Sequence, residues 1–379
     1  MSELCKHQVE CGGCELQHMN DVQYQQYKSK TLQEKLDTAG VVPQTLNPTF
    51  MVGSYKRRRC TLQIHYSKGQ ITLGFYKKKS HSIVDIQECF VLAPEIFNVI
   101  EPLKKTLSKL LQPQFLNNVY ILISHSGLDL LINSKHSPEL ICLENLVKFA
   151  TIHKIARINW QVSQRIIPVY HSQLVTTNIN NTLVELPPGA FLQATIECEL
   201  SIQQQILNLV QANKTNKIID LYAGCGTFSL IFDDKVHVLS VEGNKNMSAM
   251  VSKAIKQFNL KNKYVINQDI FHYPLKAEQL MKYEIAIINP PRNGAMPQIK
   301  ELAASKIKII VMVSCNVDSF IRDAKLLLSK NYNLRELTPV DQFRWTKHLE
   351  LFAIFDNTHT IPSTSCHTLY SENCIHSQN

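Results

Sequence analysis

The feature that most constrains the fold is a regular alternation of short apolar runs and helix-forming segments in the C-terminal half of the chain. Apolar runs of strand length occupy residues 218–221, 236–241, 264–267, 284–288 and 309–314. Alternation with helices predicts parallel βαβ units, in which helices cover both faces of a buried sheet. We therefore expect an α/β fold whose ligands bind at the carboxyl ends of the strands.

The last of these runs, residues 309–314, delivers Cys315 to the carboxyl edge of the expected sheet. A thiol at that edge is in position to act as a nucleophile. A lone cysteine after a strand is more often a small buried hydrophobic residue, so this segment alone leaves both interpretations open.

A second group of cysteines lies near the start of the chain. Three of them are spaced as C-x5-C-G-G-C, and the glycine pair lets neighbouring sulfur atoms face one centre: Cys5, Cys11 and Cys14. A fourth ligand is expected, and Cys89, in a loop, is better placed than Cys60, in an alternating strand; His18 is a further alternative. Soft thiolates select zinc or an iron–sulfur cluster, and spacing does not separate the two.

Charge and composition favour a polyanionic partner and an intracellular site. The formal net charge is +9, and two basic runs with aromatic neighbours, residues 55–59 and 76–79, flank an expected hairpin. Such runs suit an RNA strand, although a solvated edge is an equal alternative. We expect a cytoplasmic monomer, because no apolar run approaches a membrane span and eleven cysteines are more typical of metal binding or catalysis than of disulfides.

The composition of the chain and the pattern of its expected helices and strands predict four regions. Residues 1–48 form a cysteine-bearing segment and a helix over residues 23–39, and residues 49–188 form a strand-rich α+β middle domain. Residues 189–356 form the α/β domain, and a polar tail over residues 357–379 is expected to be disordered.

The turn after the first strand of the α/β domain indicates a nucleoside cofactor. Gly224 and Gly226 allow close backbone approach before an expected helix, and Glu242 ends the second strand, where a carboxylate accepts hydrogen bonds from ribose hydroxyls. The turn is not G-x-G-x-x-G, and the N-P-P-R segment from Asn289 adds a rigid loop. Together these features favour S-adenosylmethionine over a dinucleotide.

The chain resembles the RNA uracil-C5 methyltransferases, particularly the iron–sulfur members that act on large-subunit ribosomal RNA. The resemblance runs from Cys5 to Phe355. Its motifs are C-x5-C-G-G-C, F-L-Q from Phe191, D-L-Y-A-G-C-G from Asp220, N-P-P-R-x-G from Asn289, V-S-C-N from Val313, and D-Q-F-x-x-T-x-H-L-E from Asp341.

This resemblance implies a Rossmann-like class I methyltransferase domain that methylates a flipped-out uracil in RNA, with 23S rRNA favoured over tRNA. It implies Cys315 as the nucleophile and Glu350 as the base, although spacing alone would make Glu350 a surface carboxylate. Contacts to S-adenosylmethionine would come from Gln193, Tyr222, Glu242 and Asn289. A [4Fe-4S] cluster would be held by Cys5, Cys11, Cys14 and Cys89.

Two positions depart from the family pattern, and two other functions compete. Many members have Asp in place of Asn289, and Arg344-Trp345 replaces the usual proline after Phe343. The N-terminal β-barrel of longer relatives is not expected, which leaves RNA recognition to the cysteine segment and the middle domain. The alternatives are a methyltransferase of exocyclic amines, which would not need Cys315, and a non-catalytic iron–sulfur RNA-binding factor.

Overall fold

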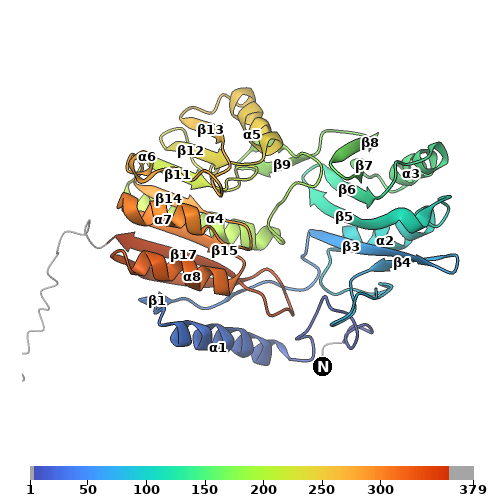
Figure 1. Ribbon diagram of the computed structural model, residues 1–379, viewed down its shortest axis with the longest axis horizontal. Coiled ribbons are helices and arrows are strands. Elements are labelled where there is room, and N and C mark those ends of the chain that lie inside the picture. Colours follow the sequence, from blue (N-terminus) through green and yellow to red (C-terminus); the bar gives the residue numbers. More distant parts are fainter. Residues whose placement is uncertain (1–3, 358–379) are drawn as a thin grey trace, which may run out of the picture.

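The computed structural model describes residues 4–357 and contains the expected α/β domain (Figure 1). Its nine-stranded sheet has a parallel centre, because helices connect the successive strands on its two faces. Antiparallel pairing joins β17 to both of its neighbours. From one edge to the other the strands are β1 (Thr45–Leu46), β16 (Tyr332–Asp341), β17 (Glu350–Asn357), β15 (Ile309–Ser314), β14 (Ile285–Ile288), β11 (Lys217–Leu221), β12 (His237–Glu242) and β13 (Lys263–Asn267), with β2 (Phe50–Met51) also paired to β16.

Alternate residues of the central strands enter two different cores. Ile285 and Ile287 face the helices on one side, whereas Ala286 and Ile288 face those on the other. This division follows from the two-residue period of a strand, and it explains why the strands are apolar throughout. One face is covered by α4 (Ile196–Asn213) and α5 (Lys245–Gln257), and the other by α1 (Asp21–Ala39), α7 (Met296–Ser305) and α8 (Val317–Leu328). The short α6 (Ala277–Leu280) packs beside α7.

The middle of the chain forms a separate six-stranded sheet with its own core. Its expected hairpin is confirmed, since Lys68 and Gly69 both adopt a positive φ in the tight turn between β3 and β4. The order is β4 (Gln70–Gly74), β3 (Arg59–Ser67), β5 (Leu116–Ser124), β6 (Gly127–Ser134), β7 (Arg157–Val162) and β8 (Arg165–His171). The sheet packs with α2 (Pro94–Leu107) and α3 (Leu140–Ile152), and η1 (Pro113–Phe115) precedes β5. A hairpin of β9 (Thr176–Ile179) and β10 (Thr182–Glu185) follows.

The N-terminal helix belongs by its packing to the α/β domain. Leu32 and Leu36 of α1 enter the core beneath α7 and α8, and β1 and β2 pair with β16. The end of α1 is as expected, with Gly40 in the left-handed conformation as the C-cap. The domain boundaries drawn from the sequence stay a prediction, and the expected disordered tail lies, except for Asn357, outside the described residues.

Two local expectations are wrong. The sequence predicts that residues 348–355, around Glu350, form the strand that closes the sheet, but β17 lies inside the sheet, between β15 and β16. The glycine-rich turn does not enter an α-helix, and residues 222–231 form successive turns instead. Tyr222, Gly224 and Gly226 all have a positive φ, so a right-handed helix cannot propagate through them. No helix in the described part of the chain is long and apolar enough to cross a bilayer.

Candidate active site and cysteine pocket

The register between β15 and β17 brings Cys315 and Glu350 together. The ladder ends with Ser314 paired to Leu351, so Cys315, the residue after β15, lies beside Glu350, the first residue of β17, at the carboxyl end of β15. The Glu350 charge acts on the Cys315 thiol, in agreement with this placement. Cys315 is half-buried and Glu350 is 2% exposed, so the thiol remains accessible beside a buried carboxyl group.

The two groups influence each other's titration. Burial raises the pKa of the Cys315 thiol, the Glu350 charge raises it further, and the cations Arg292 and Arg59 oppose both effects. Burial raises the pKa of Glu350 to about 7, against a hydrogen bond from Gln342 and the charge of Arg59. A carboxyl group that titrates near neutral pH is suited to accept a proton from a substrate.

Gln342 is a site residue that the sequence reasoning missed. Its Nε2 donates to Glu350 Oε2 at 2.5 Å and to Gln193 Oε1 at 2.9 Å. Its Oε1 accepts the backbone N–H of Ala194 at 2.8 Å. Gln193 therefore lies in the same buried hydrogen-bond network as Glu350. The available signal was the D-Q-F motif itself, which places Gln342 directly after β16.

The loop from Gln342 to Leu349 is anchored by α1. Asp341, at its start, accepts hydrogen bonds from Tyr24 Oη at 2.6 Å and Lys28 Nζ at 3.0 Å. Lys28 Nζ also donates to the carbonyl oxygen of His348 at 2.5 Å, near the end of the loop. Both ends are thus fixed by one helix, and Glu350 follows directly.

Trp345, in the middle of this loop, contacts the N-terminal segment. Its carbonyl oxygen accepts the backbone N–H groups of Glu15 at 2.8 Å and Leu16 at 2.9 Å. Its ring is buried in a small core with Leu16 and Tyr24, against which Cys14 and Cys89 are packed. We call the loop over residues 342–349, which precedes Glu350, the base loop. Where the family usually has a proline, this loop has Trp345, whose indole packs against the N-terminal segment and Cys14.

Three of the four predicted cofactor residues follow adjacent strands. Glu242 ends β12, and its two oxygens accept the N–H groups of Gly224 at 2.8 Å and Asn244 at 2.7 Å. Tyr222 follows β11 with a buried hydroxyl that has no hydrogen-bond partner among residues 4–357, and Asn289 follows β14 half-buried. Because β14, β11 and β12 are neighbours, these residues share one edge of the sheet. Gln193 reaches the site from a different segment, the loop before α4.

Much of the first basic run serves the fold. Arg58 is buried and forms an ion pair with Glu199, with an Nη2–Oε2 distance of 2.5 Å. Arg59 Nε donates to the Leu192 carbonyl at 2.6 Å, and its guanidinium lies 4.3 Å from the centre of the exposed Phe191 ring. Arg58 is therefore committed to the fold, and the RNA contact expected of the run over residues 55–59 stays a prediction for its other members. These arginines hold the F-L-Q loop, which carries Gln193.

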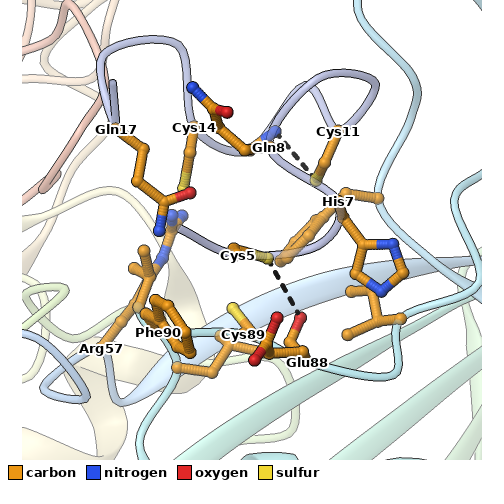
Figure 2. Close-up of a pocket in the computed structure, with 15 residues that line it drawn as sticks. Cys5, His7, Gln8, Cys11, Cys14, Gln17, Arg57, Glu88, Cys89 and Phe90 are labelled. Atoms are coloured by element: carbon orange, nitrogen blue, oxygen red, sulfur yellow. Dashed lines mark hydrogen bonds between the residues drawn. The ribbon is translucent and has the colours of Figure 1, made fainter. Parts of the chain in front are cut away.

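The second site is a cavity lined by four cysteines (Figure 2). Figure 2 shows three of them on the N-terminal segment and Cys89 on the opposite wall, with their sulfur atoms around one space. Cys5 Sγ lies 3.8 Å from the Glu88 carbonyl oxygen, and Cys11 Sγ accepts the Gly13 N–H at 3.4 Å. The set is the predicted one, Cys5, Cys11, Cys14 and Cys89. The alternatives Cys60 and His18 do not line this cavity.

The surroundings of the cysteines disfavour unneutralised thiolates. Burial, together with negative charge on Cys89, Cys11 and Cys5, raises the pKa of Cys14 to about 12. Gln17 is 4% exposed and lines the same cavity, yet neither polar atom of its side chain has a hydrogen-bond partner in the described protein. Four thiols and an unpartnered amide fit a cationic group with acceptor atoms. Within residues 4–357, no three His, Cys, Asp or Glu side chains are arranged around a single metal ion.

Comparison with known proteins gives a consistent result. The family model described as tRNA (Uracil-5-)-methyltransferase matches residues 54–357. An uncharacterized RNA methyltransferase of Zymomonas mobilis is 31% identical over 93% of this chain and 88% of its own length. A 23S rRNA (uracil(1939)-C(5))-methyltransferase of Shewanella woodyi is 28% identical over 93% of this chain and 81% of its own.

The fold is also shared with a solved structure. The crystal structure of the Pyrococcus abyssi tRNA (uracil-54, C5)-methyltransferase in complex with S-adenosyl-L-homocysteine superimposes with a TM-score of 0.69. The match covers 91% of this chain and 86% of that one at 24% sequence identity. The Rossmann-like α/β architecture expected from the alternation of strands and helices is therefore confirmed.

Proposed function

The chain belongs to the tRNA (uracil-5-)-methyltransferase family, and on that premise we propose that it transfers a methyl group from S-adenosylmethionine to carbon 5 of a uracil in RNA. The observation that carries the proposal is the register that sets Cys315, just after β15, beside Glu350 at the start of β17. An accessible thiol beside a buried carboxyl group whose pKa is raised to about 7 provides a nucleophile and a base at one sheet edge.

The nucleophile is needed because carbon 5 of uracil is too electron-poor to attack a methyl sulfonium. The Cys315 thiolate adds to carbon 6 and places an electron pair on the enolate, so carbon 5 becomes nucleophilic. Carbon 5 then takes the methyl group, and the sulfonium leaves as a neutral thioether. The positive charges of Arg292 and Arg59 favour the thiolate of Cys315 against the effect of burial.

The base completes the reaction. Glu350 removes the proton that remains on carbon 5, and the electrons of that C–H bond form the carbon 5–carbon 6 double bond and expel the Cys315 thiolate. Glu350 must be ionised to do this, and its hydrogen bond from Gln342 stabilises the ionised form. A buried, poised carboxyl group is the appropriate acid–base residue for this step.

S-adenosylmethionine would be bound along the adjacent strand ends. Glu242 already accepts two backbone N–H groups, and each carboxylate oxygen retains a lone pair for a ribose hydroxyl. The unpartnered hydroxyl of Tyr222 and the half-buried Asn289 lie on the same edge, and Gln193 approaches from the F-L-Q loop. When bound, the cofactor supplies the electrophilic methyl group.

The substrate would be RNA, with 23S rRNA favoured over tRNA. The Shewanella woodyi relative supports this choice, as does the net charge of +9. The target base would leave its stack to reach Cys315. We assign RNA contacts to the cysteine segment and the six-stranded sheet rather than to Arg58.

The cysteine cavity would hold a [4Fe-4S] cluster through Cys5, Cys11, Cys14 and Cys89. The four thiols around one cavity and the unpartnered Gln17 amide support this assignment. When bound, the cluster would neutralise the thiolates and join the N-terminal segment to the loop around Cys89. Methyl transfer needs no electrons, so we assign it a structural role. Iron and acid-labile sulfide analysis of anaerobically purified protein tests this assignment against zinc.

A covalent trap tests the proposed function. The anaerobically purified protein is incubated with S-adenosylmethionine and 23S rRNA transcribed with 5-fluorouridine, and the products are separated on a denaturing gel. Fluorine on carbon 5 cannot leave as a proton, so the enzyme is expected to stall as a protein–RNA adduct that Cys315→Ala abolishes. An adduct with tRNA alone would correct the substrate. No adduct with either RNA, from protein that binds S-adenosylmethionine, would favour methylation of an exocyclic amine.

A further inference from the structure

We propose that Gln342 is a positioning residue for the reaction: its amide holds one oxygen of Glu350, which leaves the other to receive the carbon 5 proton, and it turns the Gln193 amide toward the cofactor and the target uracil. The inference rests on the proposed function and adds a residue to it. Gln342 has no assigned part in the chemistry described above beyond its hydrogen bond to Glu350.

The orientation of the Gln342 amide is set by its surroundings. The backbone N–H of Ala194 can only donate, so the Gln342 oxygen must face it, at 2.8 Å. The NH2 group then points at two acceptors, Glu350 Oε2 at 2.5 Å and Gln193 Oε1 at 2.9 Å. The opposite orientation would place the Gln342 oxygen against a carboxylate and leave the Ala194 donor unpaired, which is costly at a buried site.

Burial makes this network rigid. Gln342, Gln193 and Glu350 are each 2% exposed, so water cannot replace a lost hydrogen bond without opening the site. The three residues come from different parts of the chain: the loop before α4, the end of β16 and the start of β17. Gln342 therefore connects the F-L-Q loop to Glu350 through hydrogen bonds.

The consequence for Glu350 is that its two oxygens become inequivalent. Oε2 is occupied by the short hydrogen bond from Gln342, and Oε1 is left to accept the substrate proton. The same bond stabilises the carboxylate and lowers its pKa against the effect of burial. Without the donor, Glu350 would remain protonated to a higher pH and would rotate more freely.

The hydrogen bond from Gln342 also sets the orientation of the Gln193 amide. Its carbonyl oxygen accepts from Gln342, so its own NH2 group faces away from Gln342. A side chain turned in this way presents a donor, which suits a carboxylate of the cofactor or a carbonyl oxygen of the base. Loss of Gln342 would allow the Gln193 amide to flip.

Two substitutions separate positioning from packing. Gln342→Met keeps the side-chain length and removes all three hydrogen bonds, whereas Gln342→Glu keeps the shape and an oxygen for the Ala194 N–H but loses both donors. The matched control is Gln298→Met, which removes another fully buried glutamine whose amide bonds both backbone groups of Leu275, at 2.9 and 3.1 Å, rather than Gln193 or Glu350. Unfolding transitions of all variants are measured alongside activity.

The readouts are the pH profile of kcat and the amount of covalent adduct on ordinary uridine RNA. In the wild type, kcat is expected to fall below about pH 7, where Glu350 becomes protonated. Gln342→Met should move this acidic limb of the profile up by about one pH unit, because Glu350 loses a hydrogen bond that stabilises its charged form. Activity at pH 7 then falls about fivefold, and methylated adduct accumulates because proton removal is slowed. Gln342→Glu should move the limb further, because two carboxylates would share the site.

The outcomes distinguish this inference from the proposed function. If wild-type protein gives no adduct with 5-fluorouridine RNA, the proposed function fails first. If wild type gives the adduct, but Gln342→Met has an unchanged acidic limb, accumulates no adduct and loses only stability as Gln298→Met does, then Gln342 has a packing role and the inference alone is overturned. If Gln342→Met does not fold, a wild-type pH profile in Gln342→Glu overturns it equally.

Discussion

The catalytic sheet edge and the cysteine cavity both gather distant residues, but different forces hold them in place. Cys315 follows β15 and Glu350 begins β17, so the ladder between these strands fixes their separation before any ligand binds. The N-terminal cysteines lie in a stretch of turns before α1 begins at Asp21. The comparison indicates that the sheet scaffold preorganises the first site, whereas the order of the cysteine cavity would come from the proposed cluster.

The largest contrast is expected between two cysteine substitutions. Cys315→Ala should lower the methylation rate by about 10⁴-fold or more, since it removes the nucleophile, while the free energy of unfolding changes by less than about 1 kcal/mol. Cys14→Ala should do the reverse, with loss of bound iron and a fall in unfolding free energy of several kcal/mol. Single-turnover assays and thermal unfolding measure both. Equal destabilisation by the two changes would remove the distinction.

Glu350→Gln should give the next largest effect, a rate loss of about 10²–10⁴-fold with accumulation of methylated adduct. Although this substitution lowers activity, it is expected to raise the free energy of unfolding at pH values where Glu350 is ionised. The pKa of Glu350 is raised by burial to about 7, so the folded protein holds a proton that the unfolded chain releases, and stability falls as pH rises from about 4.5 to 7.

The neutral amide removes this pH dependence. Glu350→Gln is therefore expected to be more stable than wild type at pH 8, by up to about 3 kcal/mol, and equal to it at pH 4. Denaturant unfolding at the two pH values measures the difference. A variant less stable than wild type at pH 8 would show that the carboxylate is better accommodated than its burial indicates.

Metal removal should act on one region first. Anaerobic chelation is expected to increase hydrogen exchange in residues 4–20 and 86–92, where the cavity walls have few regular hydrogen bonds, and to leave β15 and β17 protected. Activity should fall by about tenfold rather than be abolished, since the nucleophile and base stay in register. An equal increase in hydrogen exchange in both regions would contradict the idea that different interactions hold them in place.

The same division explains what the sequence could predict. A buried parallel strand can be recognised from neighbouring residues alone, because it is an uninterrupted apolar run. The expected run over residues 309–314 matches β15. The grouping of Cys5, Cys11 and Cys14 was predictable because their spacing is local, whereas Cys89, which lines the same cavity, was singled out by the family resemblance. The position of β17 inside the sheet was not, because only pairing with β16 reveals it. Gln342 and the Arg58–Glu199 ion pair escaped for a related reason: each depends on contacts more than 100 residues away in the chain.

Trp345 offers the finest test of how separate the two regions are. The chain has two tryptophans, so Trp160→Phe leaves Trp345 as the only tryptophan, which is excited selectively over the tyrosines at the long-wavelength edge of its absorption; Trp160 lies in the core of the six-stranded sheet. An absorbing cluster beside the buried Trp345 ring should quench its emission, because Cys14 and Cys89 pack on the same small core. Chelation should therefore increase the emission about twofold and shift it to longer wavelength as water enters.

The control for this measurement is the order of events. If the fluorescence change precedes the tenfold loss of activity, the cavity loosens first and the base loop follows through the Trp345 carbonyl, which binds the backbone N–H groups of Glu15 and Leu16. If the emission does not respond to chelation, Trp345 senses only the α1 side of its core. The two sites would then be independent, with the Tyr24 and Lys28 contacts to Asp341 sufficient to hold the base loop.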